Sequence, residues 1–323
     1  MSDTPSLCVT RRLPDPVERH LAATWRTTLS SDDRPLGPDG LARAVAEYDA
    51  LMPTITDRID AALLATPGRR VRIIANYGAG VDHIDLAAAR AAGIVVTNTP
   101  DVLTEATAEI AILLMLMASR RAGEGERELR AGQWTGWRPS HMIGQGLSGR
   151  TLGLVGFGRI AQATAAKARG LGMRILYASR SRAAAEVEAA LDARHVGSVE
   201  QLAAHCDILS LHVPGGEGTH HLVDASLLAA MQPHAILVNT ARGSVIDEAA
   251  LADALAAGRI AGVGLDVYER EPQVHPALLA HPRAVLLPHL GSATIEARSA
   301  MGMRAAANLD AFFRGEEPPD RVA

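Results

Sequence analysis

The 323-residue chain has little of several features that mark particular classes of protein. It has two cysteines, Cys8 and Cys206, which are too few for a disulfide framework and suit a reducing compartment. The formal net charge is −4, so no nucleic-acid partner and no anionic membrane surface is expected. The longest apolar run, IAILLMLMA at 110–118, is too short to cross a bilayer. The polar N-terminus has no apolar signal-peptide core, and we therefore expect a cytoplasmic protein.

Hydrophobic residues make up 48% of the chain and charged residues 21%, which is typical of a soluble globular protein with two domains. Short apolar segments alternate with Ala-rich helical ones, and this alternation predicts an α/β fold with parallel sheets. We expect a small α/β domain at 1–98 plus 289–323, with a dinucleotide-binding domain at 99–288 inserted into it. Strands are expected at 7–10, 25–29, 50–52, 71–75, 94–97, 151–155, 174–178, 207–212, 235–239, 261–267 and 284–287, and long helices at 104–120 and 294–313.

Residues 144–161 (GQGLSGRTLGLVGFGRIA) contain two glycine patterns of the dinucleotide-binding type. The second, Gly156-x-Gly158-x-x-Ala161, follows the strand-like TLGLV and precedes a helical segment, as the pattern requires. Gly156 would make the tight turn, and Gly158 would let the backbone approach a pyrophosphate at the helix N-terminus. The first pattern, GQGLSG, precedes the strand, so we interpret it as a connector.

The next strand, RILYA, ends in Ser179, Arg180, Ser181 and Arg182. An NAD site usually presents an acidic residue here to bond the ribose 2′-hydroxyl, but this turn has none. Two guanidinium groups and two hydroxyls suit a 2′-phosphate, so we expect NADP to be preferred over NAD. The alternative is a solvated basic turn.

Three segments that follow later strands each carry a residue suited to acid–base or anion chemistry: Arg242, Glu271 and His289. Ligands of open α/β sheets bind at these carboxyl ends of the strands. Each residue taken singly has a simpler, non-catalytic explanation. Arg242 could form a salt bridge, Glu271 could be an exposed surface residue, and His289 could be buried with a hydrogen bond. The three together predict a catalytic group.

These motifs together resemble the D-isomer-specific 2-hydroxyacid dehydrogenases, and within that family the glyoxylate/hydroxypyruvate reductase branch is nearest. A WxxWxP segment at 134–139 also resembles that branch. The blocks that carry the resemblance are NYGAGVDHIDL, TEATAEIAILLML, LGLVGFGRIAQATA, SLHVP, NTARGSVIDE, GLDVYEREP and LPHLGSAT, in the order of the family.

The resemblance implies a discontinuous flavodoxin-like substrate domain, an inserted Rossmann domain and a homodimer joined through the latter. It implies reduction of a small 2-oxo acid, such as glyoxylate or hydroxypyruvate, to the D-2-hydroxy acid with NADPH. Arg242 would bind the substrate carboxylate, and His289 would protonate the developing alkoxide. Glu271 would bond the far nitrogen of His289, orient the ring and favour its protonated form.

The resemblance also assigns binding positions. Ala79 and Gly80 would present backbone amides to the substrate carboxylate, and Ile55 would line the pocket; an ordinary strand-to-helix turn is the alternative for the first two. Asp266 would face the nicotinamide amide, unless it serves a structural hydrogen bond. The other expected cofactor contacts are Thr107, Gly156, Gly158, Arg159, Ile160, Ser179, Arg180, Ser181, Arg182, His212, Val213, Pro214, Thr219, Thr240, Ala241, His289 and Gly291.

Other functions stay open at the level of sequence. One is an NAD-preferring D-2-hydroxyacid dehydrogenase with a different substrate, and another is a dinucleotide-sensing, corepressor-like binding protein of the same fold. Formate dehydrogenases have Gln where this chain has Glu271, and phosphoglycerate dehydrogenases usually have extra regulatory domains. No metal is expected. His141 could reach the neighbouring subunit's active site and affect substrate preference.

Overall fold

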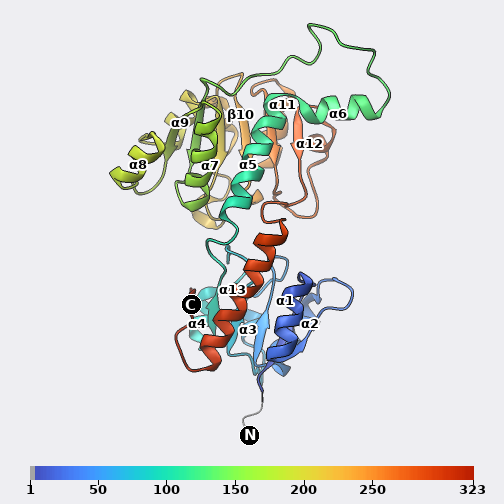
Figure 1. The fold of residues 1–323 in the computed structure, drawn as a ribbon, viewed down its shortest axis with the longest axis vertical. Helices are drawn as coiled ribbons and strands as arrows, with labels where there is room; N and C mark the ends of the chain where they lie inside the picture. The colour runs from blue at the N-terminus through green and yellow to red at the C-terminus, as the bar shows by residue number, and fades with distance from the viewer. Residues whose placement is uncertain (1–3) are drawn as a thin grey trace. The chain divides into compact units, whose positions relative to one another are not determined.

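The computed structural model describes residues 4–323 and divides into two compact units. The first unit runs to residue 103 and includes 293–323, and the second unit is 104–292 (Figure 1). The boundaries expected from the sequence, after residues 98 and 288, lie a few residues earlier. No helix among the described residues is long and apolar enough to span a membrane.

The first unit contains a five-stranded sheet in which every paired strand is parallel, in the order β2-β1-β3-β4-β5. This is the strand order of flavodoxin-like folds. Its strands are β1 (Ser6–Val9), β2 (Arg26–Thr28), β3 (Ala50–Met52), β4 (Ile73–Ala75) and β5 (Val95–Thr97). Its helices are α1 (Asp15–Thr24), α2 (Gly37–Glu47), α3 (Ala61–Leu64), α4 (Leu86–Ala91) and α13 (Ile295–Phe313).

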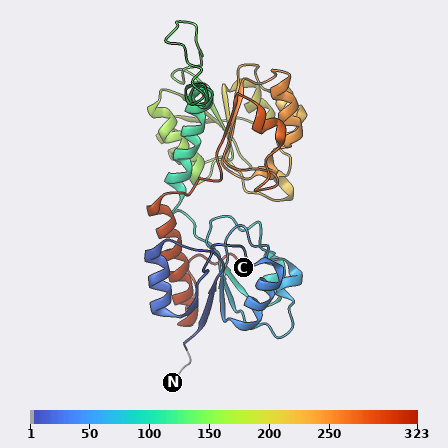
Figure 2. The same cartoon turned by 90° about the vertical axis from the view of Figure 1, so that its right-hand side faces the viewer.

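Successive side chains of a strand point to opposite faces, and in β1, β3 and β4 consecutive residues are buried, so both faces of this sheet are covered. Leu7 and Val9 pack in the cluster that includes residues of α1 and α13, whereas Cys8 between them packs in the cluster on the other face. Helices therefore cover the sheet on both sides (Figure 2).

The second unit contains a seven-stranded parallel sheet in the order β12-β11-β10-β9-β6-β7-β8. The first six strands of the unit have the Rossmann order, and β12 extends the sheet. The strands are β6 (Thr151–Val155), β7 (Arg174–Ala178), β8 (Ala193–His195), β9 (Ile208–Leu211), β10 (Ile236–Asn239), β11 (Gly262–Leu265) and β12 (Ala284–Leu286). The helices are α5 (Thr104–Ser119), α6 (Ala122–Arg130), α7 (Arg159–Gly170), α8 (Ala185–Leu191), α9 (Val199–His205), α10 (Ala225–Ala230), α11 (Glu248–Ala256) and α12 (Pro276–Ala280), with short 3-10 turns η1 (Glu217–Thr219) and η2 (Gly243–Val245).

This sheet is also buried on both faces, with Ile236 and Val238 in one core cluster and Leu237 in the other. The helix α5 packs against α7 and crosses β10 and β11 on one face. The apolar run at 110–118 lies within α5, as expected, and its most buried residues face the sheet.

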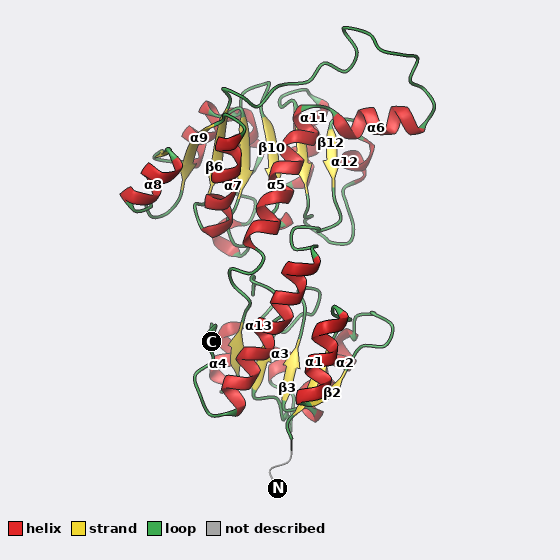
Figure 3. Ribbon diagram, in the orientation of Figure 1, coloured by secondary structure: helices red, strands yellow, loops and turns green. Residues whose placement is uncertain are grey.

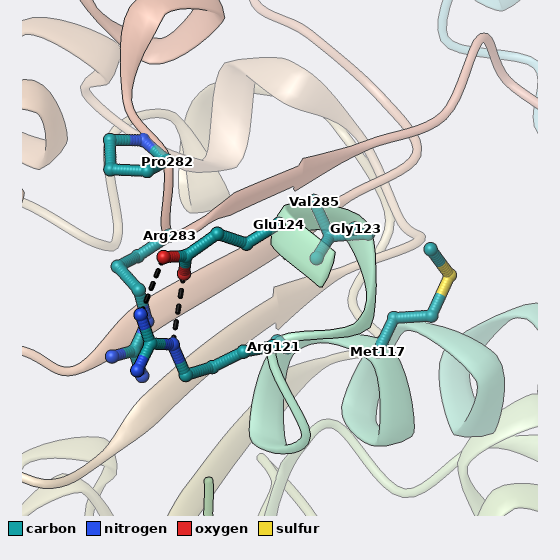
Figure 4. Close-up of a pocket in the computed structure, with 8 residues that line it drawn as sticks. Met117, Arg121, Gly123, Glu124, Pro282, Arg283 and Val285 are labelled. Atoms are coloured by element: carbon teal, nitrogen blue, oxygen red, sulfur yellow. Dashed lines mark hydrogen bonds and ion pairs between the residues drawn. The ribbon is translucent and has the colours of Figure 1, made fainter. Parts of the chain in front are cut away.

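The structure corrects several details of the expected elements. The strand expected at 261–267 ends at Leu265, because the backbone turns at Asp266 to form the site described below. The three-residue β8 was missed because its sequence, ARH, has no apolar pattern. Residues 122–130 form the helix α6, which projects with the following loop from the body of the second unit (Figure 3).

Candidate active site

The turn between β6 and α7 has the geometry of a dinucleotide-binding loop. Gly156 has φ +85°, and a Cβ there would lie 2.6 Å from the carbonyl oxygen of His212, so only glycine fits. Gly158 is the N-cap of α7, and a Cβ there would meet no described atom within 4 Å. Ala161 is fully buried under the sheet. The backbone amides at the start of α7, including those of Arg159 and Ile160, are therefore open to an anion.

The basic turn after β7 is ordered by its own hydrogen bonds. The Ser179 hydroxyl donates to the Ser181 carbonyl (2.6 Å), and Arg180 is exposed. Arg182 is also exposed, but it donates from Nη2 to Glu188 Oε2 (2.8 Å) on α8. The two arginines expected at a 2′-phosphate therefore differ in their surroundings.

The ends of β9 and β10 carry further expected cofactor contacts. Burial lowers the pKa of His212 to about 4, and its Nε2 lies 2.9 Å from Ser210 Oγ, so this ring is neutral near pH 7. Thr219 donates to the carbonyl of Pro214 (2.6 Å) and holds the loop that follows Val213. Thr240 Oγ1 is buried without a partner among residues 4–323, an unusual state for a hydroxyl. The Thr240 hydroxyl and the open turn at Gly158 both fit a bound dinucleotide.

Arg242, Glu271 and His289 come from three loops of the second unit and lie together. His289 Nδ1 is 2.9 Å from Glu271 Oε2, and both side chains are about one-third exposed. Burial would raise the pKa of Glu271, but the hydrogen bond and charge of His289, with smaller contributions from the Tyr268 amide and Arg242, lower it. Glu271 is thus held ionised beside the imidazole.

The backbone around Arg242 is shaped by two neighbours that the sequence analysis missed. Asn239 donates to the Arg242 carbonyl (2.8 Å) and accepts from the Ala241 amide (2.9 Å). Gly243 packs on the backbone of Tyr268, where a Cβ would lie 1.8 Å from the Tyr268 carbonyl carbon. An Asn at a strand end is a known turn signal and could have revealed this support.

Asp266 positions the segment of His289. The His289 amide donates to the Asp266 carbonyl (2.9 Å), and the amides of Leu290 and Gly291 donate to its carboxylate (2.6 and 2.7 Å). His289 has φ +55°, a strained value for a non-glycine residue, which these three bonds hold in place. Asp266 therefore does make the structural hydrogen bonds that were the alternative to a cofactor contact. Thr107 supports the same turn by donating to the Gly291 carbonyl (3.1 Å).

The expected substrate loop lies in the first unit, after β4. Asn76 donates to the carbonyls of Gly78 (3.0 Å) and Gly80 (2.9 Å), and Asn98 donates to that of Ala79 (2.7 Å). With their carbonyls held, the backbone amides are the groups that Ala79 and Gly80 can offer a carboxylate. The Ile55 methyl group lies beside Gly78, 3.5 Å from where a Cβ would be, and Ile55 is 37% exposed.

His220, His221 and Glu269 form a group of residue types that can bind a metal. Its two imidazoles stack with centroids 3.9 Å apart and planes 24° apart, so their in-plane lone pairs do not converge on one point. His221 bonds Glu269 instead (3.0 Å).

His141, in the loop after α6, has its Nε2 3.0 Å from Glu128 Oε2.

Comparison with known proteins identifies the family of this chain. Residues 112–291 match the family model described as D-isomer specific 2-hydroxyacid dehydrogenase, NAD binding domain. The chain belongs to this family. It is an NAD(P)-dependent oxidoreductase that acts on a small 2-oxo acid.

Relatives extend the similarity over the whole chain. A glyoxylate reductase of Thermococcus litoralis is 44% identical over 98% of this chain and 96% of its own length. A glyoxylate reductase structure from Paecilomyes thermophila superposes with a TM-score of 0.88 at 34% identity, covering 100% of this chain and 99% of that one. An NADPH-dependent glyoxylate/hydroxypyruvate reductase from Sinorhizobium meliloti, in complex with NADP and malonate, gives a TM-score of 0.86 at 36% identity over 99% and 97% of the two chains.

Proposed function

We propose that this dehydrogenase uses NADPH to reduce glyoxylate, hydroxypyruvate or a similar small 2-oxo acid to the D-2-hydroxy acid. The observation that carries the proposal is the 2.9 Å contact between His289 Nδ1 and Glu271, with Arg242 near the same carboxylate. The names of the relatives support the choice of substrate.

In this proposal the bound nicotinamide supplies the hydride, and the chain's own residues handle the substrate and the proton. Arg242 binds the substrate carboxylate with its planar fork. Because Nδ1 of His289 is engaged by Glu271, Nε2 is the nitrogen that donates the proton to the developing alkoxide. Ala79 and Gly80 bind the carboxylate through their amides, and Ile55 shapes the pocket.

The preference for NADPH is proposed on the composition of the turn after β7. It has two arginines and two serines at 179–182 and no carboxylate, which favours a 2′-phosphate over a free ribose hydroxyl. The remaining cofactor contacts are proposed as the sequence predicts them, with Asp266 and Thr107 acting through the turn at Gly291.

We also propose a homodimer joined through the second unit. The projecting α6 and the loop after it expose four large apolar side chains, Leu129, Trp134, Trp137 and Ile143, between 51% and 82%. Such a surface is typical of a protein–protein interface. The cytoplasmic location stays a prediction; Cys8 and Cys206 are buried free thiols.

The test is to mix the protein with NADPH or NADH and a panel of 2-oxo acids, and to follow absorbance at 340 nm. We expect turnover with glyoxylate and hydroxypyruvate and a higher kcat/KM with NADPH. Absence of turnover with every 2-oxo acid would contradict the reaction, and a higher kcat/KM with NADH would contradict the cofactor preference.

A further inference from the structure

Arg182 forms an ion pair with Glu188. Its Nε donates to Glu188 Oε1 (2.9 Å) and its Nη2 to Glu188 Oε2 (2.8 Å), a two-pronged geometry that orients the guanidinium toward α8. Two of its donors are thereby used within the chain. For Arg182 to bind a cofactor phosphate with the same fork, this ion pair would have to break.

Glu188 is itself held in place. The Tyr177 hydroxyl donates to Glu188 Oε1 (2.6 Å) and accepts from the Ala183 amide (2.9 Å). The Tyr177 ring is fully buried and stacks on the ring of Phe157, with centroids 3.9 Å apart. Phe157 is the residue between the two glycines of the dinucleotide turn. The position of the Glu188 carboxylate is therefore set by the core.

The burial and charge of Glu188 also favour the ion pair with Arg182. The Glu188 side chain is 11% exposed, whereas that of Arg182 is 69% exposed. Hydrogen bonds from Arg182 and then Tyr177 lower the pKa of Glu188 to about 2, so it is ionised at every pH at which the enzyme would work. Arg180 is exposed, and no partner for its side chain is found among residues 4–323.

We propose that Glu188 is a specificity-determining residue that withholds Arg182 from the cofactor, so that recognition of a 2′-phosphate depends on Arg180. The inference rests on the proposed preference for NADPH. The two arginines then have different roles: Arg180 binds the 2′-phosphate, and Arg182 is held by Glu188. Glu188 then limits how strongly the enzyme prefers NADPH, because it both engages a guanidinium and places a negative charge near the phosphate.

The test is calorimetric binding to the full chain without turnover, with adenosine 2′,5′-bisphosphate and 5′-AMP as probes. Glu188→Gln retains Oε1 as the acceptor for Tyr177 and for Arg182 Nε, but it removes the negative charge and the acceptor for Arg182 Nη2. The hold on Arg182 is thereby weakened, so we expect the preference for the bisphosphate to increase about three- to tenfold. Arg180→Gln should lower that preference about tenfold or more. The ratio of kcat/KM for NADPH and NADH should follow the same order.

Glu186→Gln is the matched control, since Glu186 is an exposed carboxylate of the same helix, whereas the ion pair of Arg182 is with Glu188. Its preference should stay at the wild-type value, which excludes a general effect of net charge. An unchanged or lower preference in Glu188→Gln would overturn the inference. The double variant Arg182→Gln/Glu188→Gln removes the ion pair without changing the net charge. If it lost as much preference for the bisphosphate as Arg180→Gln does, the inference would also be overturned. A wild type that prefers 5′-AMP and NADH would instead refute the proposed cofactor, independently of these shifts.

Discussion

His289 shows how much of the chemistry depends on individual side chains and their neighbours. Its ring is oriented by Glu271 and its backbone by Asp266, which lies 23 positions earlier in the chain. The residue types could be predicted from the sequence, since an Arg, a Glu and a His follow separate strands. The left-handed backbone of His289 and the three bonds to Asp266 could not, because they arise only when β11 and β12 lie side by side.

Replacing His289 with alanine should remove the proposed proton donor. We expect kcat for 2-oxo acid reduction to fall by about 10²–10⁴, with little change in the dissociation constant of NADPH. Stopped-flow measurement of hydride transfer and fluorescence titration of the cofactor would check this. A folded variant that retains the wild-type rate would rule out His289 as the acid.

Asp320 gives a prediction about stability against pH. Burial would raise its pKa, but hydrogen bonds from Arg304 and Asn308 lower it below the ordinary 3.8. The carboxylate therefore stabilises the fold above about pH 4, and this contribution is lost as the pH falls through the lowered value.

Asp320→Asn should accordingly lower the free energy of unfolding at pH 7 by about 1–3 kcal/mol. The difference from the wild type should shrink toward pH 3, as measured by urea denaturation at a series of pH values. A difference that stays constant with pH would show that the charge of Asp320 is not responsible.

At the scale of elements, the turn between β6 and α7 shows that two nearby glycines have different roles. Gly156 is required by the backbone, because its φ is +85° and the His212 carbonyl blocks a side chain. Gly158 has φ −75°, which any residue adopts, and it has open space around it. The glycine pattern predicted the turn, but only the surrounding atoms separate these roles.

Gly158→Ala should leave the melting temperature close to that of the wild type and weaken NADPH binding, since its methyl group would occupy the approach of the pyrophosphate. Gly156→Ala should lower stability by about 1–3 kcal/mol and weaken binding as well. Differential scanning calorimetry with a cofactor titration separates the two effects. Equal losses of stability in both variants would contradict this assignment.

Across the whole molecule, the helix α6 and its loop group four exposed large apolar side chains, Leu129, Trp134, Trp137 and Ile143, on one projecting segment. Leu129→Glu and Trp137→Glu place charges in the proposed dimer contact. We expect the wild type to be a dimer and each variant to shift toward monomer, by sedimentation velocity. A monomeric wild type at micromolar concentration would refute the homodimer.

The class of fold, the parallel strands, the position of the dinucleotide turn and the residue types of the proposed catalytic group follow from the sequence. These depend on local periodicity and on short motifs, which the chain carries wherever it folds. The packing of distant segments fixes which donors and acceptors are already used: Asp266 bonds the turn at 290–291, Asn239 bonds the Arg242 segment and Arg182 bonds Glu188. Hydrogen bonds are directional and short-ranged, so the partner of a polar side chain is known only once distant segments have been brought together.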